Sequence, residues 1–385
     1  MSRTLNDLRP VHVVGIGLHP YQAPGTQPYT ELGLTAVRAA LDDAGIGWPE
    51  VETAFVGTAL VAAASGRPML RHLGATGTSI THVENASASG SSAFRQACLE
   101  VACGVAEVAL AVGVDKPEMR PDGFSRAGVP DLLPGVVSPM THFALLAQSY
   151  MERYGATPEQ LAAVAVKNIG NAARNPCAQR RQPVTLAEVL DGKPLSGVLT
   201  RMQCCPVGEG AAAVIVASED AIARLGIDLR RAVRVEASVS MSEGLYEPTA
   251  FPDAELTRLA VAGLLRQSGR KPADLDIVEV HDAFTVEELV YAEAIGLAAP
   301  GEAARAVAAG EFDIGGRCAV SPSGGLLGMG HPIGPTGVGQ IVEIARQLRG
   351  EAGPRQHPNA RVGLAHMLGL GSVCVAHLLS VDRQA

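Results

Sequence analysis

Apolar and polar positions alternate along the chain in patterns that predict short strands and amphipathic helices. Residues 29–44 carry apolar side chains at a helical spacing, from Leu32 to Leu41, and Gly45 follows as a stop signal. Residues 107–114 form a nearly continuous apolar run, which is typical of a strand buried on both faces. Strands and helices that alternate in this way predict a parallel or mixed sheet covered by helices on both faces.

The same order of elements occurs twice. In the first half we predict strands at 11–18, 52–60, 80–83, 107–114 and 211–216, and helices at 29–44, 93–105 and 219–225. In the second half we predict strands at 233–239, 277–281, 361–366 and 371–379, helices at 255–268 and 285–295, and a helix that ends at 349. The repetition indicates a duplicated unit, and we place the halves at residues 1–230 and 231–385.

Two stretches depart from this order. Pro and Gly cluster between residues 117 and 139, and helical segments follow at 143–154, 158–174 and 186–191. We interpret residues 115–205 as an inserted loop region that folds over the first sheet. Residues 315–330 are rich in glycine, and this composition predicts a loop rather than a helix or strand.

The stretch 83–94 is the most distinctive for function. A β-branched run at 80–83 leads directly into a helix of small residues. A strand that turns sharply into a helix presents one side chain at the helix N-terminus, where free N–H groups and the helix dipole favour an anion. Ser87 is the residue presented in this way. The alternative is a Ser-rich N-cap of an ordinary helix.

Composition and charge narrow the class of protein. With 385 residues, 47% of them hydrophobic and 18% charged, the chain is globular, has a large core and has room for one to three domains. The net charge of −8, with no basic run longer than a pair, argues against a nucleic-acid partner.

Localisation and metal content follow from the distribution of apolar residues and cysteines. No apolar run reaches 18 residues, so we expect no membrane span, and the N-terminus lacks the apolar core of a signal peptide. The seven cysteines lie mostly within apolar segments, and no spacing indicates a zinc site. We therefore expect reduced thiols, no metal and a cytoplasmic location.

Four stretches resemble motifs of one family, the thiolases of the sterol-carrier-protein (lipid-transfer-protein) type. They are Asn85-Ala86-Ser87-Ala88-Ser89-Gly90-Ser91, His281-Asp282-Ala283-Phe284, Gly330-His331-Pro332-Ile333-Gly334-Pro335-Thr336-Gly337 and His366-Met367-Leu368-Gly369-Leu370-Gly371. In this order, they resemble that family's nucleophile loop, its His-Asp-Cys-Phe stretch, its Gly-His-Pro loop and its C-terminal glycine loop. Residues 171–176 are similar to the segment before the CoA-binding region.

The resemblance implies a fold, an assembly and a class of substrate. It implies two duplicated mixed-sheet α/β halves in a five-layer αβαβα arrangement, and a homodimer whose interface runs beside the nucleophile strand. It also implies acyl-CoA substrates and no permanently bound cofactor, with coenzyme A as substrate or product. Some relatives of this type work with a small zinc-ribbon/OB-fold subunit, and we expect such a partner here.

The chain departs from the family at each position where thiolases carry a catalytic sulfur. Ser87 stands where thiolases have Cys, and Ala283 stands where the sterol-carrier type has a second Cys. Other thiolases have their second Cys at the position of Met367. Cys98 and Cys374 lie near matched segments, where we expect them to pack in the core. Two explanations remain for the serine: an evolved nucleophile, or a Cys→Ser variant that stops turnover.

The matched motifs suggest roles for four residues. A serine hydroxyl needs a positioned base to act as a nucleophile, and His331 is the candidate, carried on a Gly-rich loop. The resemblance implies that His281 helps to hold the thioester oxygen, and the alternative is a helix-capping histidine. Gly369 could offer a backbone N–H to an oxyanion beside that of Ser87.

Other residues are candidates for binding CoA. The matched segment near 171–176 makes Arg174, Arg180 and Arg181 candidates for the CoA phosphates, with a solvated basic face as the alternative. Ser323 and Gly324 are further candidates for binding CoA.

Weaker acid–base candidates remain. His142 could reach the acyl pocket, although a histidine at a helix start is usually at the surface. Tyr246 and Tyr291 are possible acids, but packing residues are the simpler interpretation. Without a second Cys, either His331 does both acid–base tasks or the substrate does not require the second one.

The sequence thus predicts a thiolase-like acyltransferase that makes or cleaves a carbon–carbon bond next to a CoA thioester carbonyl, through an acyl-enzyme at position 87. One alternative is a retro-aldol lyase that acts on a 3-hydroxyacyl-CoA. Another is a non-catalytic subunit that binds CoA or lipid. The presence of both His281 and His331 favours an enzyme, because a protein that only binds needs neither.

Overall fold

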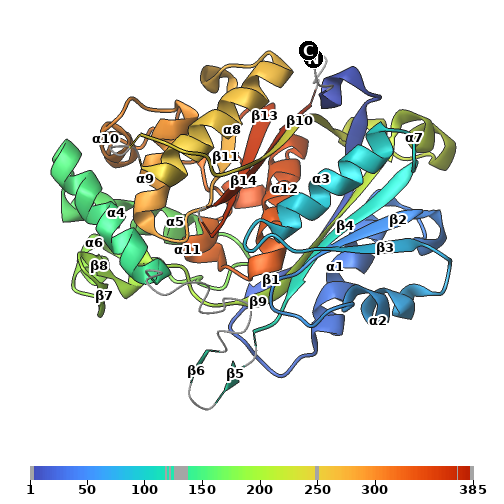
Figure 1. Cartoon of the computed structure of the whole chain (residues 1–385), viewed down its shortest axis with the longest axis horizontal. Helices are drawn as coiled ribbons and strands as arrows, with labels where there is room; N and C mark the ends of the chain where they lie inside the picture. The colour runs from blue at the N-terminus through green and yellow to red at the C-terminus, as the bar shows by residue number, and fades with distance from the viewer. Residues whose placement is uncertain are drawn as a thin grey trace.

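The structure, a computed structural model, describes residues 4–117, 119–120, 123–124, 138–247, 251–370 and 372–381 (Figure 1). Most of the Pro/Gly cluster predicted between 117 and 139, and Gly371 of the C-terminal glycine loop, lie outside the described residues. Within the described part, no helix is both long and apolar enough to cross a membrane.

Strands and helices alternate along the chain as the hydrophobic pattern predicts. Up to residue 225 they are β1 (Val11–Gln22), α1 (Tyr29–Ala44), β2 (Thr53–Gly57), α2 (Gly66–Leu70), β3 (Ser79–Val83), α3 (Ser89–Ala102), β4 (Val108–Asp115), β5 (Met119–Arg120), β6 (Gly123–Phe124), α4 (Pro139–Tyr154), α5 (Pro158–Ala173), α6 (Leu186–Leu190), β7 (Pro194–Ser196), β8 (Leu199–Thr200), β9 (Glu209–Ser218) and α7 (Glu219–Leu225). The remainder are β10 (Val233–Ser242), α8 (Pro252–Ser268), β11 (Ile277–Glu279), α9 (Thr285–Ile295), α10 (Ala303–Ala308), β12 (Ala319–Val320), α11 (Gly325–Met329), α12 (Ile333–Arg349), β13 (Val362–Gly369) and β14 (Val373–Ser380).

Ten of these strands form two groups of five with the same internal arrangement, and β5-β6 and β7-β8 are separate pairs. The first group runs β1-β9-β4-β2-β3 and the second β10-β14-β13-β11-β12. In both groups the first two pairings are antiparallel and the last two are parallel. The groups join through β1 and β10, which pair only at His12↔Arg234 and Val13↔Val233. The strand order therefore shows the internal repeat, while a boundary near residue 230 stays a prediction.

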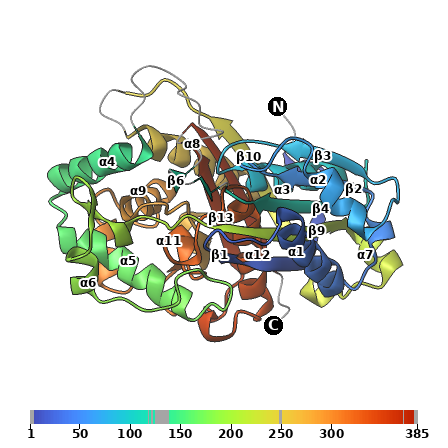
Figure 2. The same ribbon diagram turned by 90° about the horizontal axis from the view of Figure 1, so that it is seen from below.

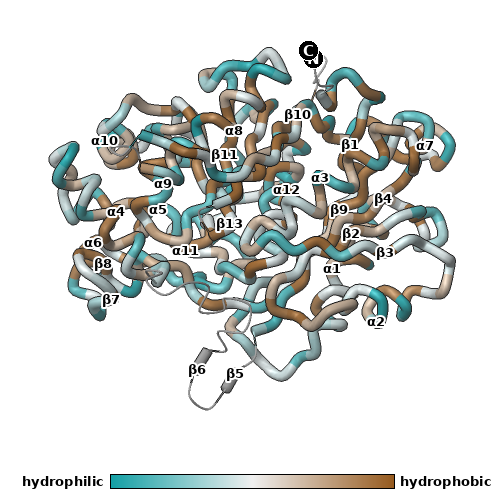
Figure 3. The backbone as a smooth tube through the Cα atoms, viewed as in Figure 1, coloured by the Kyte–Doolittle hydropathy of each residue, from teal (hydrophilic) through white to brown (hydrophobic). Residues whose placement is uncertain are grey.

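Helices cover both groups of strands and separate them, which gives the five layers. Helix α1 lies on the outer face of the first group, and α8 and α9 lie on the outer face of the second. Helices α3 and α12 lie between the groups, and α12 contacts β9, β4 and β13. Strongly apolar segments run along β1, β4, β9 and β13 in the interior (Figure 3). The three largest hydrophobic clusters correspond to the three helical layers.

Helices α4 and α5 of the predicted insertion pack on the second half, so for these helices the prediction that the insertion folds over the first sheet is wrong. Helices α4 and α5 contact α9, and α5 also contacts α10 and α11. Figures 1 and 2 both show these helices beside α9 and α11. The buried faces of α4 and α5, with Tyr150 and Leu161, join the cluster around Leu289. The outer face of the first sheet is already covered by α1.

The Gly-rich stretch 315–330 is not only a loop, as its composition predicted. It contains the short strand β12 and the helix α11. Here glycine allows close helix packing: a Cβ on Gly324 or Gly328 would come within 2.5 Å of the Cβ of Ala172 on α5. The prediction failed because composition alone does not show that these glycines also serve close packing between helices.

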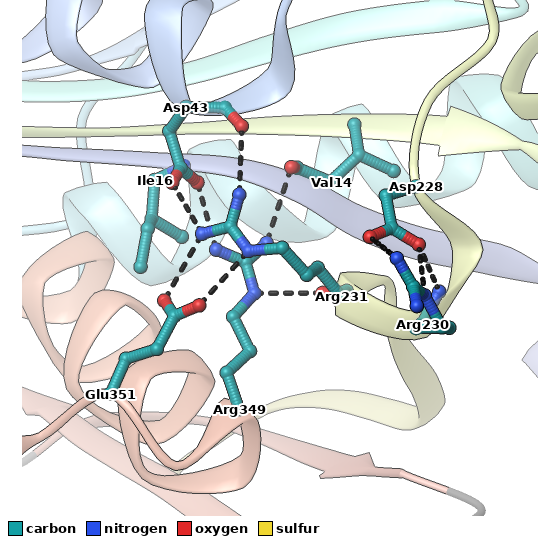
Figure 4. Close-up of polar contacts among 8 residues, drawn as sticks. All are labelled: Val14, Ile16, Asp43, Asp228, Arg230, Arg231, Arg349 and Glu351. Carbon is teal, nitrogen blue, oxygen red and sulfur yellow. Dashed lines mark hydrogen bonds and ion pairs between the residues drawn. The ribbon is translucent and has the colours of Figure 1, made fainter.

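An ion-pair cluster fixes the C-terminal end of α12 to the first half (Figure 4). Asp43, at the end of α1, accepts from Arg349 at 2.8 Å and from Arg231 at 2.8 Å. The Arg349 side chain is only 1% exposed, and its Nη2 also donates to the carbonyl of Val14 in β1. Arg231 reaches Glu351 as well, at 2.9 Å. The cluster thereby joins α1, β1, the connection between the halves and the end of α12.

Candidate active site

The turn between β3 and α3 presents Ser87 as predicted, although the helix begins at Ser89, earlier than the sequence suggested. Ala86 adopts φ +46°, a left-handed conformation that a residue other than glycine seldom takes. Ser89 holds the turn, because its hydroxyl donates to the Ala86 carbonyl at 2.6 Å and accepts from the Asn85 N–H at 2.8 Å. Ser87 itself is half-buried and is left free to face the opposite half.

His331 meets this serine from the second half. The distance from Ser87 Oγ to His331 Nε2 is 3.1 Å, a hydrogen bond between residues 244 positions apart. A close helix approach makes it possible: a Cβ on Gly90 would lie 2.3 Å from the Gly334 carbonyl oxygen. The N-termini of α3 and α12 therefore meet at the candidate site.

Thr336 fixes the tautomer of His331. The Thr336 hydroxyl lies 2.6 Å from the Pro332 carbonyl, which can only accept, so the hydroxyl donates there. Its oxygen must then accept from His331 Nδ1–H, at 2.9 Å. Nε2 is left without a proton and accepts from the Ser87 hydroxyl. Burial, with a smaller effect of His281, lowers the pKa of His331 well below its usual 6.5, so the ring is neutral near pH 7 and Nε2 keeps its lone pair free to accept a proton.

His281 lies beside His331, with ring centroids 5.4 Å apart and edge-on. Its Nδ1 bonds the Glu287 carboxyl at 2.9 Å, and Glu287 also accepts from the Tyr291 hydroxyl at 3.0 Å. Burial raises the pKa of Glu287. His281 Nε2 is buried and has no hydrogen-bond partner among the described residues. An unpartnered buried nitrogen beside the serine–histidine pair is suited to bind a substrate oxygen.

Two residues of the C-terminal motif pack under the nucleophile turn. Gly369 ends β13 so close to it that a Cβ would lie 2.5 Å from the Asn85 carbonyl oxygen. Met367 is fully buried and packs against Ala88. The structure thus brings Ser87, His281, His331 and Gly369 together, while their roles stay predictions.

The predicted CoA-binding residues do not form one cluster. Arg174 and Arg181 are exposed, whereas Arg180 is half-buried and donates to the Leu327 carbonyl at 2.9 Å. Ser323 is buried, and its hydroxyl donates to Glu279 at 2.7 Å. Gly324, at φ +110°, packs tightly against α5.

The weaker acid–base candidates and the two cysteines near the matched motifs lie in different surroundings. His142 bonds Asp253 at 3.3 Å, which raises the pKa of His142. Tyr291 belongs to the Glu287 cluster described above. Tyr246 is half-buried, and its hydroxyl accepts from the Gly244 N–H at 3.0 Å. Cys98 and Cys374 are fully buried, as expected for core residues.

The sequence reasoning missed three groups at the site: Thr336, Glu287, and the segment 203–207. Thr336 lies five residues after His331, in the first turn of α12, and Glu287 lies six residues after His281, in the first turn of α9. A polar side chain in the first turn of the helix after each histidine was the signal that could have identified them. The segment 203–207 contains Cys204 and Cys205, and no local pattern placed it beside the histidines.

Comparison with known proteins agrees with this fold. Residues 23–186 match the family described as thiolase, N-terminal domain, and residues 248–381 match thiolase C-terminal domain-like. Human sterol carrier protein 2 is 36% identical over 96% of this chain and 72% of its own length. The benzoylsuccinyl-CoA thiolase subunit BbsB of Thauera aromatica is 35% identical over 94% of this chain and 95% of its own.

Solved structures extend the comparison. The Ltp2-ChsH2(DUF35) aldolase superposes with a TM-score of 0.85 at 26% identity, covering 97% of this chain and 98% of that one. Human mitochondrial 3-ketoacyl-CoA thiolase superposes with a TM-score of 0.74 at 19% identity, covering 97% and 99%, which shows the fold alone. With both domain families matched in chain order, and with relatives above 30% identity over almost its whole length, this chain belongs to the thiolase family and is an enzyme of the acyl-CoA acyltransferase class.

Proposed function

We propose that the chain makes or cleaves a carbon–carbon bond next to the carbonyl of an acyl-CoA thioester, with the acyl group carried on Ser87. The observation that carries this proposal is the 3.1 Å contact between Ser87 Oγ and His331 Nε2, with Nε2 left free of a proton by Thr336. A hydroxyl paired with a neutral, oriented imidazole is the arrangement that nucleophilic acyl transfer requires.

The chemical steps follow from this arrangement. His331 accepts the Ser87 proton as the oxygen attacks the substrate carbonyl. In the second half of the reaction it takes the proton of the CoA thiol and passes it to the departing Ser87 oxygen. The negative charge that develops on the carbonyl oxygen lies close to His281 Nε2, which donates to it when protonated. The Gly369 N–H, beside that of Ser87, is a second candidate donor, and each such donor lowers the barrier by about 3 kcal/mol.

CoA enters as substrate or product, and no permanently bound cofactor is needed. The exposed Arg174 and Arg181 are the better candidates for the CoA phosphates, because Arg180, Ser323 and Gly324 are engaged within the protein. A homodimer remains part of the proposal. So does a small partner subunit, supported by a relative named as a thiolase subunit and a structural neighbour named as a complex with a DUF35 protein.

Intact-protein mass spectrometry tests the acyl-enzyme. Incubation with a panel of acyl-CoAs and 3-oxoacyl-CoAs is expected to add an acyl mass at residue 87, with a burst of free CoA. His331→Asn should slow acylation at least ~100-fold, which is the lower range for losing a general base. Ser87→Ala is the matched control and should show no adduct.

Ser87→Cys decides which nucleophile the protein evolved to use. If the Cys form shows the burst and the Ser form is slower by orders of magnitude, the working form has Cys at 87. If the Ser form is faster, Ser87 is the evolved nucleophile. If neither is acylated but a 3-hydroxyacyl-CoA is cleaved, the acyl-transfer mechanism is wrong.

That last outcome would support the second candidate, a retro-aldol lyase that forms no acyl-enzyme. Two observations favour it. The positions of the family's second sulfur hold Ala283 and Met367, and the structural neighbour with a TM-score of 0.85 is named an aldolase.

A further inference from the structure

No thiol occupies positions 283 or 367, so the group that handles the proton on the substrate α-carbon is unassigned. His331 already exchanges a proton with Ser87. The segment 203–207, which connects the inserted region to β9, runs beside both histidine-bearing stretches and carries two adjacent thiols. It is therefore the place to look for a second acid–base group.

On one side this segment pairs with the stretch that holds His281. Cys204 forms an antiparallel bridge with Phe284, and the Cys205 N–H donates to the Ala283 carbonyl at 2.7 Å. Cys205 is thus opposite Ala283. Residues opposite each other in antiparallel pairing project to the same face, with Cβ atoms about 4.5–5.5 Å apart. The Cys205 side chain therefore lies over the small Ala283.

On its other side the segment pairs with the loop that carries the base. The His331 N–H donates to the Pro206 carbonyl at 3.4 Å, and Val207 forms a parallel bridge with His331. Cys205 is thus held between two stretches whose histidine rings are 5.4 Å apart. His281 Nε2, which is buried without a hydrogen-bond partner among the described residues, lies in the same region and is available to bind a ligand.

The two cysteines are not equivalent. Cys204 lies opposite Phe284, whose ring stacks on the ring of Phe143 at a centroid distance of 4.7 Å. The Cys204 thiol donates to the Cys205 carbonyl at 3.4 Å. Cys204 is therefore directed to the aromatic contact with α4. Cys205 is directed to the face of Ala283.

We propose that Cys205 is the catalytic acid–base residue for the substrate α-carbon, an assignment that rests on the proposed acyl transfer at Ser87. In the cleavage direction the Ser87 oxygen, its proton passed to His331, forms a bond to the 3-carbonyl carbon. The bond from that carbon to the α-carbon breaks, and its electron pair passes to the departing thioester as an enolate.

Cys205 S–H then protonates the α-carbon, which releases the shorter thioester and leaves a thiolate. The thiolate regains a proton from the His331 imidazolium, and the acyl group remains on Ser87 until CoA removes it. Contact with Cys204 and burial raise the pKa of Cys205, so the thiol holds the proton that this step needs.

The test separates α-carbon chemistry from acylation. Acetyl-CoA in D₂O reports proton exchange at its methyl carbon by NMR, and intact mass reports acylation of residue 87. Cys205→Ala is expected to lower the exchange rate by ~100-fold or more and to leave acylation within about threefold of wild type. Cys204→Ser, the matched control, should leave both rates within about threefold.

A measurement on the unchanged protein guards against misfolded variants. Because the raised pKa keeps Cys205 as a thiol, alkylation needs iodoacetamide at alkaline pH and a long incubation. Peptide mapping should then find Cys205 alkylated in the native protein, and saturating acetyl-CoA should protect it. Exchange that persists in Cys205→Ala, a Cys204→Ser rate as low as that of Cys205→Ala, or alkylation of Cys205 that acetyl-CoA does not change would each overturn the assignment. Absence of acylation in the wild type would instead reject the function on which it rests.

Discussion

Replacing Thr336 with valine tests whether the tautomer of His331 controls reactivity. Valine keeps the shape of threonine but removes the hydroxyl, so His331 Nδ1–H loses its acceptor. Thr336 is only 4% exposed, so water does not readily replace that acceptor. A hydrogen bond to a charged group contributes about 1.5–3 kcal/mol, against about 0.5–1.5 for a neutral pair. The substitution therefore removes about 1–1.5 kcal/mol more hydrogen-bond stabilisation from the imidazolium that forms during attack than from the neutral ring.

That difference alone slows acylation about 5- to 12-fold, since each 1.36 kcal/mol is a factor of ten. Loss of the fixed tautomer adds to it, because a ring that protonates Nε2 cannot accept from Ser87. We expect a total decrease of about 10- to 100-fold. The unsatisfied N–H should also lower the free energy of unfolding by about 1–3 kcal/mol.

The assay is the pre-steady-state rate of acyl-adduct formation by quenched intact-mass spectrometry, with thermal melting run in parallel. Thr336→Ser keeps the hydroxyl and should stay within about threefold of wild type. Equal rates for the Val variant and wild type would refute the tautomer argument. A Ser variant as slow as the Val variant would show that the methyl group, and therefore packing, matters instead.

Three further changes test other parts of the structure. Gly369→Ala places a Cβ 2.5 Å from the Asn85 oxygen and should displace the nucleophile turn, lowering the acylation rate about 100-fold; an unchanged rate would contradict the close approach. Burial lowers the pKa of His377 to about 3 in the folded protein, against about 6.5 in the unfolded chain. The neutral ring therefore contributes to folding stability above about pH 6.5, and this contribution is lost as the pH falls. Between pH 7 and pH 5, urea unfolding should show wild type losing about 2 kcal/mol more than His377→Gln, and equal losses would refute a neutral buried ring. Arg349→Met should lower the free energy of unfolding by about 3 kcal/mol, the low end for breaking a buried ion pair, because Asp43 keeps its second arginine; a change below 1 kcal/mol would show that the pair stabilises little.

The sequence predicted well the elements that a local pattern defines. Helices α1 and α9 have the predicted bounds, since one carries a clear amphipathic period and both end at a glycine in the left-handed region, Gly45 and Gly296. The candidate site was also predictable. The strand-to-helix turn indicated Ser87, and the resemblance to thiolase motifs indicated His281 and His331, whose catalytic roles stay predictions.

What the sequence could not supply depended on contacts between distant segments. Nothing local shows that Gly324 and Gly328 serve to bring α11 against α5. Nothing local shows that Cys205 lies beside Ala283, 78 positions later, because that pairing forms only once the inserted region packs on the second half.

The repeated strand order has an evolutionary consequence. Strands β3 and β12 hold corresponding places in the two groups, and each is followed by a left-handed residue other than glycine, Ala86 at φ +46° and Ser321 at φ +53°. If the halves descend from one duplicated ancestor, both inherited a turn able to present a nucleophile. Selection for turnover then acts on the first copy, where Ser87 remains accessible, while the second copy, with Ser321 fully buried, is constrained only by its packing.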